Sequence, residues 1–374
     1  MTRPVDGRPS QPVLGGVLHP VGSRAEAVRL ASVIAALRAA GIPQAVSRLA
    51  GPDDGGVFDD EGVPRTERLV DDEPSSRAQR TALALTEAER ALVAHAPSMV
   101  MLAGDSDVTL AFALAASKLG IPLARVGGGL RCGDFSLAGE INRVMTDRLA
   151  DVIFTDSRDA ADALEVEGIA GDRVHTVGNT SVDLLFRHEE RARRAATFRT
   201  YGLEAGQYVL ATLHRERNVC DHDRIVRIAD ALVKLAHRTP VVLPLHPLTR
   251  RLMEETESLA RLDAAGVVAI APLPYIEFLS LLHSSGAILT DAGGVQDEAS
   301  ALGITCYTLR RDTERSVTLT HGTNVLLGED PEEIADLHVE FRRHSVGAIP
   351  FWDGRAGERV AAEITQRLAI PLAG

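Results

Sequence analysis

The sequence predicts an α/β protein built from two doubly wound, Rossmann-like domains that face each other across a cleft. Three observations lead to this fold class. The chain has 374 residues, a length that suits two domains. Short apolar runs alternate with stretches of helical period along most of the chain, the pattern of parallel sheets covered by helices. A polar, arginine-rich segment from Ser181 to Gln207 interrupts this alternation, which starts again at Tyr208.

The composition is that of a globular protein with large cores, because 45% of the residues are hydrophobic and 25% are charged. No apolar run approaches the roughly 18 residues of a membrane span, and a net charge of -12 argues against a nucleic-acid backbone as partner. The three cysteines are far apart and follow no ligand spacing, so neither a disulfide framework nor a metal site is predicted, and no cofactor is expected. Residues 1–12 lack the apolar core of a signal peptide and are expected to form a disordered arm. A cytoplasmic protein is therefore expected.

The N-terminal domain is predicted over residues 13–190. Its first strand, Val13 to Leu18, leads through a loop into a helix whose apolar face ends at Gly41. Residues 50–75 are acidic and glycine-rich and are expected to form a long surface excursion. Further strands are predicted at 99–102, 122–126, 151–155 and 174–177, with helices at 78–94, up to Leu119 and up to Ala150.

The C-terminal domain is predicted over residues 191–355, with strands at 208–213, 241–245, 287–289 and 304–309. The third of these strands leads into Gly293 and Gly294, just before a helix predicted from Val295 to Leu302. A strand, a glycine turn and a helix start bring free backbone N–H groups and the positive end of a helix dipole to one place. This arrangement predicts a phosphate site, and the alternative is an ordinary strand-to-helix turn.

Other polar residues of the C-terminal domain lie near this turn. Glu298 belongs to the first turn of the helix, where its carboxylate can accept hydrogen bonds from ribose hydroxyls. Arg310 and Arg315 belong to a cationic turn after the next strand, for which the alternative interpretation is a solvated charge run. His214 and His246 each follow a predicted strand, at the edge where α/β sheets bind ligands. A lone histidine is more often structural, and two at one edge favour a functional role.

The N-terminal domain has its own candidates at the carboxyl ends of its strands. Asp105 follows the strand at 99–102, where α/β sheets present catalytic groups, and its alternative role is a helix N-cap. Arg24 lies in the first turn of the first predicted helix. Glu140 and Arg143 follow three consecutive glycines, which let a ligand or another backbone come close. Two such domains suit a nucleotide sugar, with the phosphates on the second domain and the sugar between the two.

Taken together, the motifs resemble those of the non-hydrolysing UDP-N-acetylglucosamine 2-epimerases, which have the two-domain fold called glycosyltransferase B. The matching segments follow the same order along nearly the whole chain: Gly22-Ser23-Arg24-x-Glu26-Ala27, Gly104-Asp105, Gly129-Leu130-Arg131-x-Gly133-Asp134, Glu140-x-Asn142-Arg143, Gly178-Asn179-Thr180, His214-Arg215-x-x-Asn218, His246-Pro247, Thr290-Asp291-x-Gly293-Gly294-x-Gln296-x-Glu298, Arg310-x-x-Thr313-Glu314-Arg315 and Gly322-Thr323-Asn324.

The resemblance implies roles for several of these residues. It implies that Arg24, His214, Gly293 and Gly294 hold the diphosphate, that Glu298 binds the ribose, and that Arg315 supports the same cleft. It also implies a homodimer and a last helix, 356–374, that crosses back onto the first domain. The full set of candidates comprises the catalytic residues Asp105, His214, Glu140 and Arg143 and the substrate-binding residues Arg24, His246, Gly293, Gly294, Glu298, Arg310 and Arg315.

The sequence departs from the family pattern at positions that bear on the chemistry. The family has one glutamate in a His-Val-Glu-Ala-Gly-Leu-Arg segment and another just before the Glu-x-Asn-Arg motif, and both are thought to take part in acid–base chemistry. This chain has Gly127 and Gly139 there, and Ala292 replaces a serine of the phosphate turn. Losing a positioned proton-transfer group commonly costs about 10²–10⁴-fold in rate, whereas breaking the anomeric C–O bond needs mainly stabilisation of the leaving group.

The main prediction is therefore an enzyme that cleaves the anomeric C–O bond of a sugar phosphate, sugar diphosphate or nucleotide sugar. It would transfer the sugar to a small-molecule acceptor as an O- or N-glycoside, with a nucleobase among the acceptors considered. The first alternative is an epimerase that interconverts UDP-N-acetylglucosamine and UDP-N-acetylmannosamine, with Asp105, Glu140 or Asp134 in the missing roles. The second alternative is an inactive sugar-nucleotide-binding protein. No nucleic-acid or membrane partner is expected in any of these cases.

Overall fold

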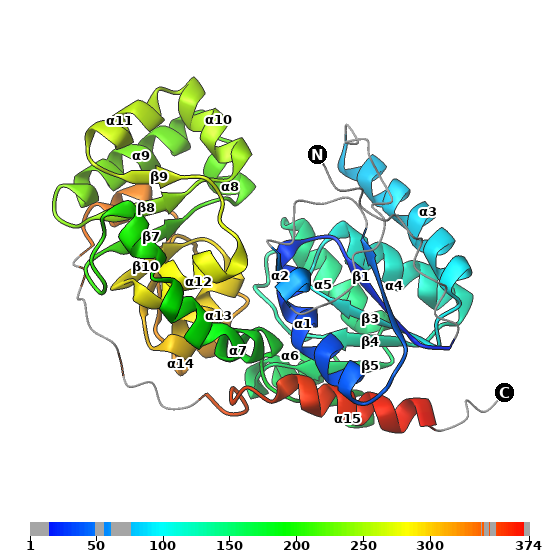
Figure 1. Ribbon diagram of the computed structural model, residues 1–374. Coiled ribbons are helices and arrows are strands. Elements are labelled where there is room, and N and C mark those ends of the chain that lie inside the picture. Colours follow the sequence, from blue (N-terminus) through cyan, green and yellow to red (C-terminus); the bar gives the residue numbers. More distant parts are fainter. Residues whose placement is uncertain are drawn as a thin grey trace, which may run out of the picture. The chain divides into compact units, whose positions relative to one another are not determined.

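The computed structural model describes residues 15–48, 56–60, 76–337, 339, 344 and 349–369. The arm predicted at 1–12 and most of the excursion predicted at 50–75 lie outside these residues. The chain divides into two compact units, of which unit 1 is formed from Met1–Leu184 and Asp353–Gly374 and unit 2 from Leu185–Trp352. Each unit has a six-stranded parallel sheet and helices (Figure 1). The predicted fold class of two doubly wound α/β domains is thus confirmed.

The sheet of unit 1 has the strand order β2-β1-β3-β4-β5-β6. The chain runs from β1 outward to β2, returns to β3, and then continues in the opposite direction to β6. This reversal makes the point between β1 and β3 the topological switch point, where α/β folds bind ligands at the carboxyl ends of their strands. The strands are β1 (Val17–Val21), β2 (Gln44–Arg48), β3 (Met99–Ala103), β4 (Leu123–Val126), β5 (Val152–Thr155) and β6 (Val174–Thr176).

Several helices of unit 1 start at serine N-caps. Ser23, Ser106 and Ser157 are the N-caps of α1, α4 and α6, and each side chain accepts a hydrogen bond from the N–H three residues further on. Because Ser106 caps α4, Asp105 is not an N-cap and its carboxylate is available for another role. The helices are α1 (Arg24–Ala39), α2 (Val57–Asp60), α3 (Arg77–His95), α4 (Asp107–Leu119), α5 (Ala138–Leu149), α6 (Arg158–Val166) and α15 (Ala356–Ala369). Helix α7 (Thr180–Ala195) begins in unit 1 and ends in unit 2.

The first strand is displaced from its predicted position. The predicted strand ended at Leu18, but β1 extends to Val21 and includes His19 and Pro20, which were expected in a loop. Pairing with β3 ends at Leu18, whereas pairing with β2 continues to Val21. Beyond Leu18 the strand thus has a single neighbour, and a proline is tolerated where one side of a strand is unpaired.

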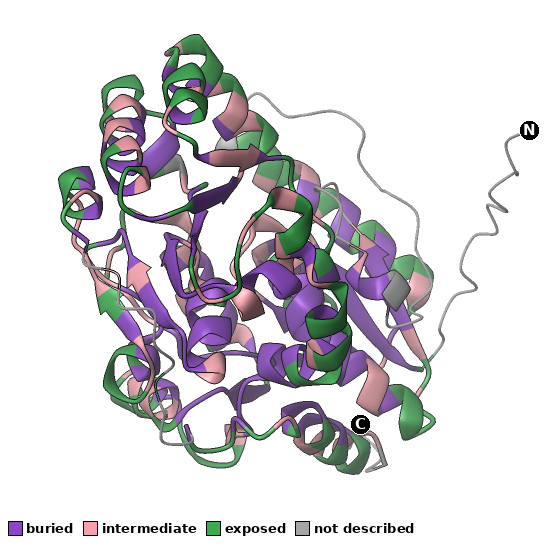
Figure 2. Cartoon of the chain, turned by 60° about the vertical axis from the view of Figure 1, so that its left-hand side comes forward, coloured by how far each residue is buried: buried purple, intermediate pink, exposed green. Residues whose placement is uncertain are grey.

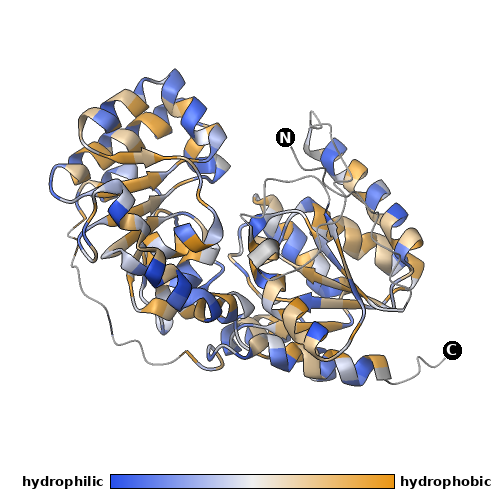
Figure 3. Cartoon of the chain, in the orientation of Figure 1, coloured by the Kyte–Doolittle hydropathy of each residue, from blue (hydrophilic) through white to orange (hydrophobic). Residues whose placement is uncertain are grey.

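The core of unit 1 forms where the strands meet the apolar faces of α3 and α4. The residues of its central strands β3 and β5 are all buried, and the purple strands of Figure 2 and the orange strands of Figure 3 show this buried, apolar character of the sheets. Helix α15 runs beside α1 (Figure 1), and a Cβ atom on Gly357 would lie 2.8 Å from the carbonyl oxygen of Ser32, so only glycine permits this approach. Asp183 fixes the start of α15 by accepting hydrogen bonds from the N–H groups of Ala356 at 3.1 Å and Gly357 at 2.7 Å. Helix α15 is therefore held firmly against unit 1 at both α1 and Asp183.

The sheet of unit 2 has the order β12-β11-β10-β7-β8-β9, so its switch point lies between β7 and β10. An apolar cluster of this unit joins β7, β8 and β10 to α9. The strands are β7 (Val209–Thr212), β8 (Val241–Pro244), β9 (Val268–Ile270), β10 (Ala287–Thr290), β11 (Thr305–Thr308) and β12 (Asn324–Leu326). The helices are α8 (Glu216–Val219), α9 (His222–Ala236), α10 (Pro247–Glu255), α11 (Ser258–Ala264), α12 (Tyr275–Ser284), α13 (Gly293–Leu302) and α14 (Ser316–Thr320).

Helix α13 begins two residues earlier than predicted. Gly293 and Gly294 form its first turn instead of a separate glycine turn, and Ala292 is the N-cap without a side-chain hydrogen bond. A Cβ atom on Gly293 would lie 2.4 Å from Oε1 of Glu314, so a glycine is required where the helix starts against the 310–315 segment. No helix within the described ranges is both long and apolar enough to cross a bilayer.

Candidate functional site

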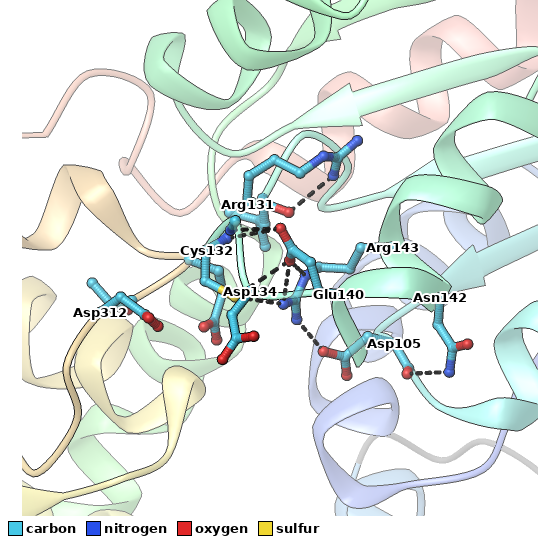
Figure 4. A network of polar contacts seen from close by, with 12 residues as sticks. Asp105, Arg131, Cys132, Asp134, Glu140, Asn142, Arg143 and Asp312 are labelled. Carbon is cyan, nitrogen blue, oxygen red and sulfur yellow. Dashed lines mark hydrogen bonds and ion pairs between the residues drawn. The ribbon is translucent and has the colours of Figure 1, made fainter. Parts of the chain in front are cut away.

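The switch point of unit 1 carries a cluster of polar residues that we call the Asp105 cluster: Asp105, Cys132, Glu140, Asn142 and Arg143 (Figure 4). Nη1 of Arg143 donates to Oδ2 of Asp105, and the Asn142 side-chain amide donates to the backbone oxygen of Asp105 at 3.0 Å. Asp105 comes from the turn after β3, and both of these donors come from α5. The structure thus brings together three predicted catalytic residues, Asp105, Glu140 and Arg143.

Glu140 lies deepest in the cluster, with 1% of its surface exposed. One carboxylate oxygen accepts from the N–H groups of Cys132 at 3.1 Å and Gly133 at 2.8 Å, and the other accepts from Nε and Nη2 of Arg143 at 3.0 and 2.6 Å. Burial alone would raise the pKa of Glu140, but the hydrogen bonds from Arg143 and the two amides outweigh it and hold this pKa below its ordinary value. A carboxylate that stays ionised and is fully hydrogen-bonded is suited to fixing Arg143.

Gly127 and Gly139, the positions where the sequence resemblance led us to expect glutamates, are both closely packed. Gly127 has a φ of +69°, and a Cβ atom there would lie 2.3 Å from Nη1 of Arg29. Gly139 is the second residue of α5, and a Cβ atom there would lie 2.8 Å from Oδ2 of Asp105. The space beside each glycine is therefore filled by a charged side chain from another element, a guanidinium in one case and a carboxylate in the other.

Glu26, at the start of α1, is a buried carboxyl group that was not among the candidate residues predicted from the sequence. It accepts hydrogen bonds from the N–H of Gly22 at 2.6 Å and from Oγ1 of Thr109 at 2.8 Å, which joins the turn after β1 to the start of α4. Burial raises the pKa of Glu26 above its ordinary value. A Cβ atom on Gly104 would lie 2.4 Å from the Glu26 side chain, so Glu26 packs against the residue before Asp105. Arg24, the first residue of α1, is half-buried at this same edge.

The switch point of unit 2 is organised by Asp291, a fully buried carboxylate just after β10. It accepts hydrogen bonds from the N–H groups of His214 at 3.2 Å and Arg215 at 3.0 Å and from the side-chain amide of Asn218 at 2.9 Å. Nδ1 of His214 lies 3.5 Å from Oδ1 of Asp291, and 53% of the His214 side chain is exposed. Asp291 therefore holds the turn after β7 and orients the ring of His214 while leaving it open to a ligand.

The second histidine, His246, is the N-cap of α10, and its Nδ1 accepts from the N–H of Leu248 at 3.3 Å. Burial lowers the pKa of His246, and the charge of His214 lowers it further. An imidazole whose Nδ1 accepts from the backbone leaves Nε2 as the ring donor. The two histidines therefore act on each other electrostatically, as expected for residues at the ends of neighbouring strands.

The two candidate arginines of the predicted cationic turn 310–315 are buried, whereas Arg311 in the same turn is exposed. Arg310 donates to Glu314 at 2.7 Å and lies 3.6 Å from Asp312, and both Arg310 and Glu314 are more than nine-tenths buried. Nη1 of Arg315 lies 3.5 Å from the buried carboxylate of Asp297. Arg310 and Arg315 are thus paired with carboxylates of unit 2 and do not belong to a solvated charge run, and their contacts order the segment against α13.

Glu298, the predicted ribose-binding residue, lies in α13 and is buried. It accepts a hydrogen bond from the hydroxyl group of Tyr275 at 3.1 Å. Gly294 is exposed at the N-terminus of the same helix, and no neighbouring atom lies within 4 Å of the place that a Cβ atom would take there. Across the part of the chain that the structure describes, no group of three or more His, Cys, Asp or Glu side chains has the geometry to hold a metal ion.

Known proteins share this sequence and fold. Residues 56–365 match the family model described as UDP-N-acetylglucosamine 2-epimerase. A UDP-N-acetylglucosamine 2-epimerase of Methanocaldococcus jannaschii is 31% identical over 356 residues, which cover 92% of this chain and 97% of the relative. A UDP-2,3-diacetamido-2,3-dideoxy-D-glucuronate 2-epimerase of Pseudomonas aeruginosa is 36% identical over 318 residues, which cover 83% of this chain and 86% of the relative.

Solved structures are similar over the same length. The crystal structure of the M. jannaschii UDP-GlcNAc 2-epimerase in complex with UDP-GlcNAc and UDP has a TM-score of 0.86 at 30% identity and covers 94% of this chain and 99% of its own. The UDP-GlcNAc 2-epimerase of Neisseria meningitidis bound to UDP-GlcNAc has a TM-score of 0.84 at 26% identity, with the same coverage. The two α/β units therefore form the fold type that the sequence motifs predicted.

The main functional prediction, transfer of a sugar to an acceptor, is wrong. The matching family model and the relatives named above are 2-epimerases, which favours the first alternative. The prediction treated two missing glutamates as two missing proton-transfer groups. In the structure the carboxylate of Asp105 lies against Gly139, so a carboxylate is present beside this position although the residue at the position has none.

Proposed function

Because this chain belongs to the UDP-N-acetylglucosamine 2-epimerase family, we propose that it inverts the configuration at C2 of a UDP-linked 2-acetamido sugar, with UDP-N-acetylglucosamine as the first substrate to test. The observation that carries the proposal is the Asp105 cluster. It places a half-exposed carboxylate, held by a buried Arg143 to Glu140 ion pair, at the switch point of a Rossmann-like unit. A C2 epimerase needs a positioned proton acceptor of this kind.

Unit 2 supplies the features that suit the UDP part of the substrate. The N-terminus of α13 offers backbone N–H groups at Gly293 and Gly294 with no side-chain cap, so they can donate to a diphosphate. His214 projects from the turn held by Asp291, and a protonated ring would donate to phosphate oxygens and stabilise them as they leave. Glu298 in the same helix has a carboxylate suited to ribose hydroxyls.

The proposed reaction moves one proton and one leaving group. Asp105 takes the proton from C2, the C1–O bond breaks with its electron pair going to UDP, and a C1=C2 double bond forms. Asp105 then releases its proton to solvent, a proton from water is added to the opposite face of C2, and an oxygen of UDP re-adds at C1, which gives the epimer. Arg143 keeps the Asp105 carboxylate in place during these steps, and His214 and the α13 amides stabilise the charge on UDP.

The experiment is incubation of the protein with UDP-N-acetylglucosamine in D2O, followed by mass spectrometry and proton NMR. We expect deuterium at C2 and the appearance of UDP-N-acetylmannosamine. Asp105→Asn keeps the shape but cannot take a proton, and it should lower the exchange rate by about 10²–10⁴-fold while UDP affinity is kept. Asp162→Asn, an exposed residue of α6 paired with Arg158, is the matched control and should keep the parent rate.

Two outcomes would overturn the proposal. One is a protein that binds UDP by calorimetry yet shows neither deuterium incorporation nor epimer with any UDP-linked 2-acetamido sugar. The other is an Asp105→Asn enzyme that exchanges the C2 proton at the parent rate. The substrate panel should include UDP-2,3-diacetamido-2,3-dideoxy-D-glucuronate, because a relative that is 36% identical is named for this substrate.

A further inference from the structure

We propose that Gly139 is a positioning residue, because the space left by its missing side chain is the space that the Asp105 carboxylate occupies against Arg143. The inference rests on the proposed function, in which Asp105 is the proton acceptor. It assigns a role to a position where the sequence resemblance led us to expect a glutamate. The expected consequence is that restoring a side chain there impairs the enzyme.

The geometry at Gly139 is tight on one side only. An added Cβ atom would lie 2.8 Å from Oδ2 and 3.3 Å from Cγ of Asp105, and its next neighbour, Nη1 of Arg143, lies 3.6 Å away. A carbon and an oxygen atom that are not bonded do not approach to 2.8 Å without repulsion, whereas 3.6 Å is an ordinary contact. The conflict is therefore with Asp105 alone.

Asp105 is the partner that has to move. Its side chain is 46% exposed, whereas the Arg143 side chain is 6% exposed. Arg143 is fixed by two hydrogen bonds to Glu140, whose other oxygen is fixed by the backbone of residues 132 and 133. A side chain at position 139 would thus push the Asp105 carboxylate toward solvent and away from Arg143, and α5 would stay in place.

A glutamate at position 139 would add charge to this steric effect. Its Cβ atom would already be in contact with Asp105, and its carboxylate would lie near the guanidinium of Arg143, which is paired with the carboxylates of Asp105 and Glu140. Two carboxylates at one guanidinium repel each other, and a third must displace one of them. Asp105, which is the most exposed, would be displaced.

The test compares Gly139→Ala and Gly139→Glu with the parent in the C2 deuterium-exchange assay and in UDP binding by calorimetry. We expect turnover to fall at least tenfold in both variants, while UDP affinity stays within threefold. Ile141→Ala, at an exposed position of α5, is the control and should keep the parent turnover. A Gly139→Ala enzyme within threefold of the parent turnover, or a Gly139→Glu enzyme faster than the parent, would overturn the inference.

A second measurement needs no activity and separates this inference from the proposed function. Alanine is preferred over glycine inside a helix, so Gly139→Ala should raise the Tm once the clash is removed. We expect a larger rise in an Asp105→Ala background than in the parent, because the double-mutant cycle isolates the contact between the two residues. Equal shifts in both backgrounds would refute the contact. A parent that exchanges no C2 proton, together with unequal shifts, would refute only the proposed function.

Discussion

Replacing Asp291 by asparagine should destabilise unit 2 by about 2–4 kcal/mol. The buried carboxylate accepts from two backbone N–H groups, of His214 and Arg215, and from the Asn218 side chain. A hydrogen bond to a charged acceptor contributes about 1.5–3 kcal/mol and a neutral one about 0.5–1.5 kcal/mol, so each of these bonds loses on the order of 1 kcal/mol. The side-chain NH2 group of the new asparagine would also face an N–H donor where a carboxylate oxygen faced it before, so one of the three hydrogen bonds would be lost altogether.

The assay for Asp291→Asn is thermal unfolding, together with hydrogen exchange at the N–H groups of the turn after β7. For a unit of this size about 1 kcal/mol corresponds to roughly 2–4 °C, so the Tm should fall by about 4–16 °C. Asp312→Asn makes the same chemical change at a half-exposed residue whose ion pair with Arg310 is 3.6 Å long, and it should stay within about 0.5 kcal/mol. Equal effects of the two changes would refute the role given to Asp291.

Two further changes test buried groups of unit 1. Burial in β1 lowers the pKa of His19 to about 4 from 6.5, so between these pH values the unfolded chain binds a proton that the folded chain does not, and stability falls as the pH falls. In His19→Leu, up to about 3 kcal/mol of this pH dependence of the free energy of unfolding, measured with urea, should disappear. A variant whose free energy of unfolding changes with pH as in the parent would contradict this role of His19. Gly127 and Gly120 have φ values of 69° and 68°, but only at Gly127 would a Cβ atom meet a neighbour, Nη1 of Arg29 at 2.3 Å. Gly127→Ala should therefore cost about 1–3 kcal/mol more than Gly120→Ala in unfolding experiments, and equal costs would count against the packing argument.

The fold class followed from the sequence because parallel sheets leave a strong local signal. Their strands are buried on both faces and read as continuous apolar runs, and serine caps and glycines mark the ends of the helices between them. The ends of the strands and helices were harder to predict. β1 includes Pro20 because the strand loses one neighbour at Leu18, and α13 includes Gly293 and Gly294 because the 310–315 segment packs against its first turn. Both reasons lie in contacts that no local window contains.

The candidate site shows the same division. The turns at the switch points could be named from the sequence, since each follows an apolar run. The hydrogen-bond and ion-pair partners within these turns could not be predicted. Asp291 accepts from N–H groups of a turn more than seventy residues earlier, and Arg315 pairs with Asp297, which lies in α13. Glu26 was visible in the first turn of α1, but its burial against Gly104 depends on the packing of two strands.

The functional prediction failed for a related reason. A glycine in place of a glutamate shows that a side chain is missing at that residue, and it says nothing about which group fills the space. At Gly139 the space is filled by another carboxylate, and at Gly127 by a guanidinium. A missing side chain therefore excludes a reaction only when no neighbouring group in space can take its place.

Buried carboxylates have a common task in the two units. Glu140, Asp147 and Asp291 are each buried, and each accepts hydrogen bonds from the backbone of a turn at the carboxyl end of a strand. A buried ion pair adds little net stability, because desolvation offsets most of the attraction. The hydrogen bonds to the backbone amides do restrict the turns, and these turns carry Cys132, Arg131 and His214. We infer that these three buried carboxylates serve mainly to fix the turns that carry residues of the candidate site.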